Sequence, residues 1–248
     1  MWERLSRYEP SSFLGRAIRL PLRVIPKDAA LPVVTGPARG LKWRVGSGQY
    51  GYWLGTAERD KRITFANSVA KGMVIYDIGA NVGYYTTLAA KYAGSNGRVL
   101  AFEPVPQNVR MLLDNVSLNG FDNVEVLECA LAAHSGVEFF ALTGHPNTGH
   151  LDEDGDFEVP VFALDELIQD KALPFPDLIK IDVEGAEEAV LRGASQTISH
   201  QHPITFVAVH SDRLKAQCTA FMVRFGYKAS ELTNQPDELV FEHPDRTH

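Results

Sequence analysis

From residue 73 onwards, short apolar segments alternate with longer helical ones, and this alternation constrains the fold more than any other feature. The apolar segments are typical of buried strands: MVIYDIG, RVLAFEP, VEVLECALA, DLIKIDVEG and ITFVAVHS. Helical segments such as YYTTLAAKYA and VPQNVRMLLDNVSLNG lie between most of them. Strands that alternate with helices predict a parallel sheet joined by right-handed crossovers. We therefore expect an α/β fold, with helices on both faces of one mostly parallel sheet.

Two interruptions refine this expectation. Between the third and fourth predicted strands, GVEFFALT and FEVPVFAL are typical of two extra strands around a polar loop at residues 144–156. The loop is predicted to be a mobile, substrate-side lid. At the end of the chain, YKASELT and DELVFEH form a predicted hairpin, which would add an antiparallel last strand to the parallel sheet.

The first 70 residues lack this rhythm and are predicted to form an N-terminal extension, with a helical segment and a short hairpin near residues 41–45. Residues 71–248 would form the main domain. Residues 1–30 alternate basic and apolar residues, a pattern that favours a cap packed on the domain over contact with a membrane surface. Prolines at 10, 21 and 26 interrupt any long helix there.

Composition narrows the class of protein. The 248 residues are long enough for one large α/β domain, and the formal net charge of −7 disfavours nucleic acid as a partner. The two cysteines do not have metal-ligand spacing, and no apolar run is typical of a signal peptide or a membrane span. We expect a cytoplasmic protein. Its oligomeric state stays open, a homodimer included.

The segment VIYDIGANVGYY predicts a cofactor site where the first strand meets its helix. In such sheets, ligands bind beyond the carboxyl ends of the strands, and Gly79 and Gly83 would let a ligand approach the backbone. A dinucleotide motif needs glycine where Asn81 stands, and Asp77 would repel a pyrophosphate. Glu103 closes the next strand, where an acid binds ribose hydroxyls. A cationic, phosphate-free nucleoside such as S-adenosylmethionine fits this pattern.

Several motifs resemble the FkbM family of S-adenosylmethionine-dependent methyltransferases. They are YDIGANVGYYT, VLAFEPVPQNV and LIKIDVEGAEEAVLRGA, with YWLGTAE upstream and NVEVLECALAAHSG between. The resemblance covers residues 50–210 and implies the seven-stranded, Rossmann-like class I methyltransferase fold. It also implies that the methionine moiety binds at the turn, the ribose at Glu103 and the adenine at residues 129–131. The complete cofactor set so implied is Glu58, Asp77, Gly79, Ala80, Asn81, Gly83, Tyr84, Glu103, Pro104, Ala130 and Asp182.

The segment KIDVEG predicts the catalytic residues. Asp182 and Glu184 are two positions apart, so in an extended strand they would project to the same side. His210 ends the neighbouring strand and is a candidate second base, with a structural role as the alternative. Asp182 and His210 could also hold Mg²⁺ or Mn²⁺ together with the acidic loop 144–156. Glu187 and Glu188 follow at the start of a helix, where acids suit the helix dipole; this explanation is preferred for Glu188, and the role of Glu187 stays open.

These features predict a methyltransferase that methylates a hydroxyl of a sugar or secondary metabolite. The first alternative moves the methyl group to the nitrogen of a small amine. The second is a domain that binds the nucleoside without turnover. The predicted partner is a small-molecule or glycan acceptor, whose identity the sequence does not reveal.

Overall fold

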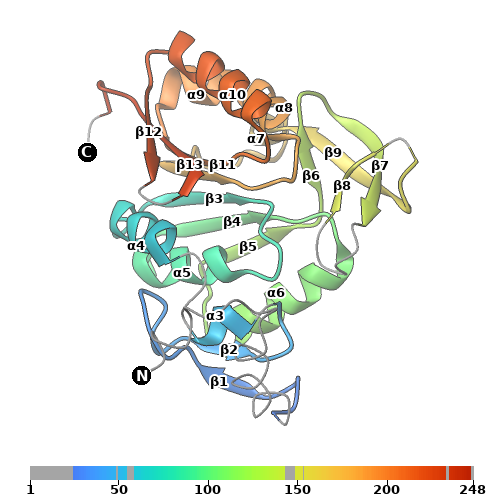
Figure 1. The fold of residues 1–248 in the computed structure, drawn as a ribbon, viewed down its shortest axis with the longest axis vertical. Helices are drawn as coiled ribbons and strands as arrows, with labels where there is room; N and C mark the ends of the chain where they lie inside the picture. The colour runs from blue at the N-terminus through green and yellow to red at the C-terminus, as the bar shows by residue number, and fades with distance from the viewer. Residues whose placement is uncertain are drawn as a thin grey trace.

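The computed structural model describes residues 25–48, 50–54, 59–142, 149–152, 154–232 and 235–246. Its centre is a seven-stranded sheet in the order β12-β13-β11-β10-β3-β4-β5 (Figure 1). The strands are β3 (Val74–Ile78), β4 (Arg98–Phe102), β5 (Val124–Leu127), β10 (Leu178–Ile181), β11 (Ile204–Ala208), β12 (Lys228–Leu232) and β13 (Gln235–Glu242). β3, β4, β5, β10 and β11 pair in parallel, and β13 runs antiparallel between β11 and β12. The predicted fold class, with its reversed last strand, is confirmed.

Helices cover both faces of the sheet (Figure 1). On one side lie α4 (Arg59–Ser68), α5 (Tyr84–Ala93) and α6 (Pro106–Leu118). On the other lie α7 (Leu164–Lys171), α8 (Glu187–Gly193), α9 (Ser195–Gln201) and α10 (Asp212–Arg224). Neighbouring residues of each strand point to opposite layers: Ile75 packs with the α4 and α5 side, whereas Tyr76 packs with the α7 to α10 side. Because both faces are buried, the strands read as nearly continuous apolar runs.

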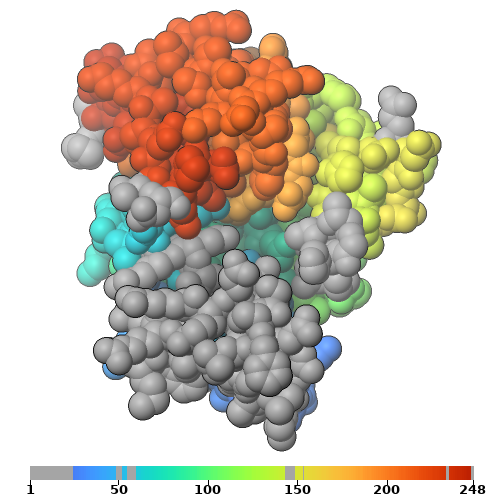
Figure 2. Space-filling model, viewed as in Figure 1, coloured from blue at the N-terminus to red at the C-terminus, as the bar shows by residue number. Residues whose placement is uncertain are grey.

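A second sheet, in the order β6-β9-β7-β8, projects from one edge of the molecule (Figures 1 and 2). Its strands are β6 (Ala130–Ala132), β7 (Gly136–Leu142), β8 (Gly149–Leu151) and β9 (Phe157–Ala163). The segment VEVLECALA, predicted as one strand, is in fact two. The backbone turns at Glu128 and Cys129, so β5 ends the main sheet and β6 begins the second one. The apolar pattern continues across the turn because both strands are packed.

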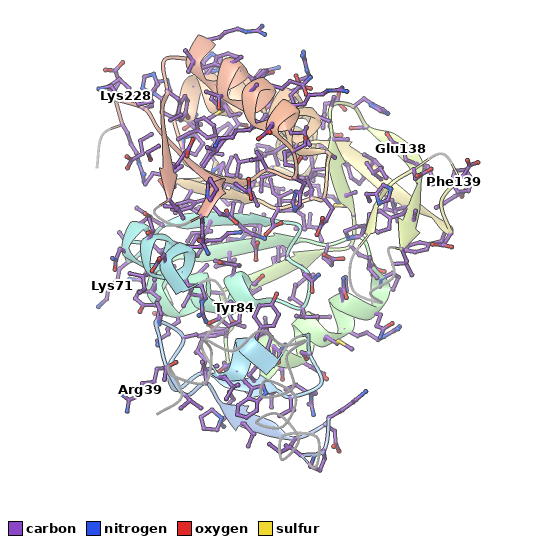
Figure 3. The ribbon with its side chains drawn as sticks, viewed as in Figure 1. Arg39, Lys71, Tyr84, Glu138, Phe139 and Lys228 are labelled. Atoms are coloured by element: carbon purple, nitrogen blue, oxygen red, sulfur yellow. The ribbon has the colours of Figure 1, made fainter. Side chains whose placement is uncertain are left out.

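The described part of the extension contains a hairpin of β1 (Ala30–Pro32) and β2 (Lys42–Arg44), followed by the short helix α3 (Tyr50–Leu54). Trp43 of β2 packs edge-on to Tyr84 of α5, which anchors the hairpin on the domain. Figure 3 labels Tyr84. The basic segment predicted as a cap or membrane contact lies mostly outside the described residues, which begin at residue 25. Within the described ranges, no helix is both long and apolar enough to cross a membrane.

Candidate functional site

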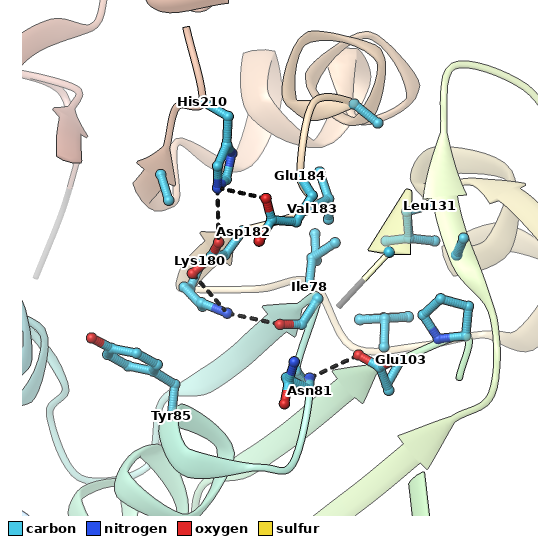
Figure 4. A pocket seen from close by; sticks show the side chains of 18 of the residues that line it. Ile78, Asn81, Tyr85, Glu103, Leu131, Lys180, Asp182, Val183, Glu184 and His210 are labelled. Carbon is cyan, nitrogen blue, oxygen red and sulfur yellow. Dashed lines mark hydrogen bonds and ion pairs between the residues drawn. The ribbon is translucent and has the colours of Figure 1, made fainter. Parts of the chain in front are cut away.

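A cavity of about 780 Å³ opens at the carboxyl ends of β3, β4, β10 and β11, which is where a parallel sheet of this type places its ligands. The turn after β3 and the segment after β4 form one end of it. Residues 182–184 after β10 and residues 209–212 after β11 form the other. We call these the turn end and the acidic end. Figure 4 shows both, with Asn81 and Glu103 at the turn end and His210 at the acidic end.

The structure gives the two glycines of the turn a packing reason in addition to the predicted approach of a ligand. Gly79 and Gly83 both have positive φ, at 71° and 86°. A Cβ on Gly79 would lie 1.9 Å from the backbone oxygen of Asp182, and one on Gly83 would lie 2.8 Å from Leu112 Cγ of α6. Gly79 lines the cavity, but Gly83 faces α6 behind it. The two glycines therefore permit close packing of β10 and α6 around the turn.

The side chain of Glu103 accepts the hydrogen bonds that stabilise the turn end. Its Oε2 accepts a hydrogen bond from the Asn81 amide at 2.8 Å, and its Oε1 accepts from the Val105 amide and Asn108 Nδ2, both at 3.0 Å. Burial raises the pKa of Glu103, and these hydrogen bonds and the charge of Lys180 oppose that rise. The carboxylate lines the cavity, so the same group that fixes the turn also faces a ligand.

Asp77 does not face the cavity as predicted. Its side chain is fully buried, accepts a hydrogen bond from Thr86 Oγ1 at 2.6 Å and pairs with Lys180 Nζ at 3.0 Å. Lys180 also donates to the backbone oxygen of Gly79 at 3.0 Å. Asp77 therefore lies beneath the cavity surface, where its charge neutralises that of Lys180, the residue that hydrogen-bonds the turn.

The predicted adenine residues lie beside the second sheet. Ala130 and Pro104 line the cavity as expected. Phe140 of β7 and Leu151 of β8 line it too, and they belong to the same apolar cluster as Val105 and Ala130. Residues 144–148 and 153 of the predicted lid lie outside the described residues. Of its described residues, Gly149 and Leu151 line the cavity, and Leu151 packs with Val105 and Ala130 at the turn end.

Asp182 lies at the acidic end, just after β10. Its Oδ2 pairs with Lys61 Nζ of α4 at 3.2 Å and lies 3.9 Å from Lys180 Nζ. Burial acts to raise the pKa of Asp182, but the positive charges of Lys61, Lys180 and His210 outweigh it and hold the pKa below its ordinary value. The side chain is thus an ionised carboxylate at neutral pH. Lys61 also pairs with Glu238 of β13, so α4 and β13 are tied to this site.

His210 connects the other acids. Its Nδ1 hydrogen-bonds Glu187 at 2.5 Å, and its Nε2 lies 3.3 Å from Glu184 Oε2 and 3.8 Å from Asp182 Oδ1 (Figure 4). The hydrogen bond to Glu187 raises the pKa of His210 to about 9 against the opposing effect of burial, and the charges of Glu184 and Asp182 add to the rise. A pKa raised in this direction favours the protonated ring at neutral pH, whereas the predicted second base would need the neutral form.

Asp182 and Glu184 meet as predicted, but for a different reason. β10 ends at Ile181, and Glu184 has φ of 51°, so the two are not alternate residues of an extended strand. The turn itself brings both carboxylates to His210. Left-handed backbone at a non-glycine residue is strained and recurs at functional sites.

The predicted metal site can be compared with the donor atoms that Asp182 and His210 present in the structure. Two ammonium groups lie within 4 Å of Asp182 Oδ2, and Nδ1 of His210 is already bonded to Glu187. Among the described residues, no group of three or more histidine, cysteine or acidic side chains is arranged to hold a metal ion. Oδ2 of Asp182 and Nδ1 of His210 are thus already engaged by other side chains, so the described donor set does not fit a divalent cation.

The cavity contains most of the predicted cofactor residues. Tyr84 lines it, and its hydroxyl receives a hydrogen bond from Arg62 at 2.6 Å. Glu58 lies outside the described residues. Sequence reasoning missed Lys61, Lys180, Glu238 and Phe140, and it named Glu187 without giving it a partner. Only Lys180 gave a signal, as a charged residue inside the apolar strand LIKI.

Comparison with known proteins identifies the family. Residues 77–234, more than half of the chain, match the model of the methyltransferase FkbM domain. The chain is 30% identical over 138 residues to the hexuronic acid methyltransferase AglP of Haloferax volcanii, covering 55% of this chain and 54% of that one. It is 30% identical over 103 residues to a protein-L-isoaspartate O-methyltransferase of Methanococcoides burtonii, covering 38% of this chain and 51% of the relative. The chain thus spans about half the length of these relatives.

A solved structure has the same fold. The crystal structure of methyltransferase FkbM from Methylobacillus flagellatus KT superposes with a TM-score of 0.53 at 20% identity, over 71% of this chain and 44% of that one. At this identity the likeness concerns the fold alone, and it agrees with the strand order described above. The motifs, the fold and the family match concur: the chain belongs to the FkbM family of S-adenosylmethionine-dependent methyltransferases and has the class I methyltransferase fold.

Proposed function

We propose that this protein transfers the methyl group of S-adenosylmethionine to a hydroxyl of a sugar or a secondary metabolite. One observation carries the proposal: a single cavity has an ionised carboxylate, Asp182, at one end and a nucleoside-type turn with Glu103 at the other. A carboxylate at a transfer site supports a hydroxyl acceptor, because a hydroxyl must lose its proton on methylation, whereas a neutral amine mainly needs positioning.

The residues present fit the cofactor. Glu103 offers carboxylate oxygens beside the turn, which suit ribose hydroxyls and would repel a pyrophosphate. The apolar wall at Ala130, Phe140 and Leu151 suits a flat base. The acids around His210 favour a sulfonium cation. We assign the turn at residues 79–81 to the methionine moiety, Glu103 to the ribose, and Ala130 with Pro104 to the adenine.

The bound cofactor supplies an electrophilic methyl group, and the chain's own residues align the acceptor and take up its proton. We assign proton uptake to Oδ1 of Asp182, because Oδ2 is held by Lys61. The cationic His210 directs Nε2 toward the same place and orients the acceptor oxygen together with Glu184. The lowered pKa keeps Asp182 ionised at neutral pH, which is the form that can accept a proton.

The proposed class of acceptor is supported by fewer observations than the cofactor. The relative from Haloferax volcanii is named a hexuronic acid methyltransferase, which supports a sugar acceptor. We propose a small-molecule or glycan acceptor that enters at the acidic end. Because the described part of loop 144–156 faces the turn end, we propose that it covers the base of the cofactor rather than selecting the acceptor.

Two measurements test this function. Titration calorimetry should show S-adenosylmethionine or its demethylated product binding, with no binding of NADH. Transfer of a tritiated methyl group should then occur to members of a panel of sugar and phenolic hydroxyls, and exceed transfer to matched amines. Binding without transfer to any acceptor would favour the non-catalytic alternative, and transfer confined to amines would favour the N-methyltransferase. Activity should persist in EDTA, because the donor set does not fit a divalent ion.

A further inference from the structure

Two adjacent glutamates at the start of α8 have different surroundings. Glu188 lies near the surface and pairs with Arg192 at 2.6 Å, one helical turn away. Glu187 is fully buried. Both suit the positive end of a helix dipole, so the helix alone would explain two exposed acids. It does not explain why one of them is buried, because the dipole effect does not require the loss of water.

The contacts of Glu187 point to His210. Its Oε1 accepts a hydrogen bond from the Gly185 amide at 3.0 Å and bonds Nδ1 of His210. Its Oε2 is buried and makes no hydrogen bond to any described residue. A buried carboxylate with one unsatisfied oxygen is costly unless a cation lies beside it. His210 is that cation, and the bond to Nδ1 fixes the plane of its ring.

The fixed ring directs its other nitrogen into the cavity. Nε2 lies 3.3 Å from Glu184 and 3.8 Å from Asp182, and both of these side chains line the cavity (Figure 4). The charged groups that face the ring are therefore Asp182 at the end of β10, Glu184 in the turn and Glu187 on α8. A neutral imidazole bonded through Nδ1–H would offer a lone pair at Nε2, whereas the cation offers a hydrogen.

We propose that Glu187 is a positioning residue of the methyl-transfer site, which holds His210 as a cation with its Nε2 hydrogen directed at the acceptor oxygen. The proposal rests on the proposed function for its acceptor, but the state of His210 can be measured without one. In transfer, the new carbon–oxygen bond forms as the carbon–sulfur bond breaks, and the hydroxyl proton passes to Asp182. His210 keeps its own proton and donates a hydrogen bond that orients the oxygen. The raised pKa of His210 agrees with this state.

The direct test follows the protonation of His210 by NMR in the folded protein labelled at histidine. The His210→Gln variant assigns its signal among the eight histidines of the chain. In the unmodified protein the ring should remain protonated beyond pH 8. In Glu187→Gln, a change that keeps the size but removes the charge, the titration should move toward the ordinary histidine value of about 6.5. Glu188→Gln is the matched control and should leave it unchanged. Equal titration in Glu187→Gln and the unmodified protein would overturn the proposal.

Kinetics add a readout that a purely structural role would not change. At pH 8, Glu187→Gln should lower kcat about 10-fold or more, the scale of one oriented hydrogen bond, with little change in cofactor Kd. Relative to the unmodified enzyme, its activity should recover as the pH falls to 6, because His210 regains its proton while Asp182 stays ionised. A loss that is the same at both pH values would contradict the proposal. Absence of transfer to every acceptor would refute the proposed function, and the NMR titration would then decide the role of Glu187.

A second pair of variants covers the case in which Glu187→Gln does not fold. His210→Gln leaves the buried carboxylate of Glu187 without its cation and should lower the Tm. Adding Glu187→Gln to His210→Gln should raise the Tm again, because the unpaired charge is removed. Additive losses in the double variant would show that Glu187 serves the helix and not the histidine.

Discussion

The two ends of the cavity are built in different ways. The turn end is built on consecutive residues, 79–82, and the Asn81 amide among them donates a hydrogen bond to the side chain of Glu103. The acidic end consists of side chains from distant segments: Lys61 of α4, Asp182 after β10, Glu187 of α8, His210 after β11 and Glu238 of β13. The first is a local structure, whose shape follows from a short motif. The second exists only when five separate segments of the chain have come together.

The ends also differ in what holds them. The turn is fixed by hydrogen bonds that its own backbone makes, to the Phe102 carbonyl and to the side chains of Glu103 and Lys180. Charges fix the acidic end, where each cation serves more than one acid: Lys61 pairs with Asp182 and Glu238, and His210 faces three carboxylates. Such a network is sensitive to the loss of any member, because a buried partner is then left unpaired.

The largest expected effect separates chemistry from cofactor binding. Asp182→Asn keeps the shape of the side chain but removes its ability to accept a proton. We expect kcat to fall about 10²- to 10⁴-fold, the usual contribution of general acid–base catalysis, with cofactor affinity nearly unchanged. Steady-state kinetics would measure the fall in kcat on an acceptor identified in the methyl-transfer panel. Asp122→Asn, at an exposed position, is the control. Normal turnover by Asp182→Asn would show that Asp182 does not accept the proton in methyl transfer.

Glu103→Ala should have the opposite profile. It removes the acceptor of three hydrogen bonds and the proposed ribose contact, so cofactor binding should weaken by about 1.5 to 3 kcal/mol. At saturating cofactor, kcat should change much less. Titration calorimetry measures the affinity, and Glu125→Ala, which breaks the surface pair with Arg98, is the control. If Glu103→Ala binds the cofactor as tightly as the unmodified chain, the ribose assignment is wrong.

Gly79 links the two ends, because the carbonyl of Asp182 packs directly on its Cα. Gly79→Ala would force these segments apart and should destabilise the fold by about 1 to 3 kcal/mol more than Gly94→Ala. Gly94 also has positive φ, at 68°, but a Cβ added there would meet no neighbouring atom within 4 Å. Gly94 has ψ of −178°, a combination almost restricted to glycine, so its variant carries backbone strain without the close approach, and a larger loss in Gly79→Ala on urea unfolding would come from the contact with Asp182. Equal losses would mean that the contact with Asp182 does not constrain the turn.

Phe140→Ala tests whether the second sheet serves the turn end. Phe140 is 7% exposed and lines the cavity beside the predicted adenine residues. Its loss should weaken cofactor binding by about 1 kcal/mol and leave the acceptor KM unchanged at saturating cofactor. Phe139→Ala is the neighbouring control, because Phe139 points away from the main sheet and is exposed (Figure 3). If Phe140→Ala raises only the acceptor KM, this part of the second sheet and loop 144–156 contact the acceptor rather than the cofactor.

The smallest effect concerns pH. Lys61→Met removes a positive charge that lowers the pKa of Asp182, so that pKa should rise, and the acid limb of kcat/KM should move to higher pH. A carboxyl with a lowered pKa stabilises the fold above its unfolded pKa of about 3.9 and loses that contribution as the pH falls through the folded pKa. The variant should therefore lose stability at a higher pH than the unmodified chain, as urea unfolding at several pH values would show. Lys71→Met, on the outer surface (Figure 3), should shift neither curve.

How much the sequence could predict follows the same division. The strand and helix rhythm predicted the main sheet and its reversed last strand, because periodicity reports which faces are buried. It did not reveal that the chain leaves the main sheet at Cys129, because both strands around that turn are apolar. The sequence singled out Gly79 and Asp77, but it did not show which residues they contact. Those residues, Asp182 and Lys180, are about 100 residues away.

By itself, the sequence determined the fold class and the family, since these depend on periodicity and consecutive motifs. Only the tertiary structure decided the protonation states at the acidic end. A carboxylate or an imidazole takes its pKa from burial and from charges within a few ångströms, and here those charges come from α4, β10 and α8. For that reason His210 could be predicted as a base from its residue type, whereas its surroundings make it a cation.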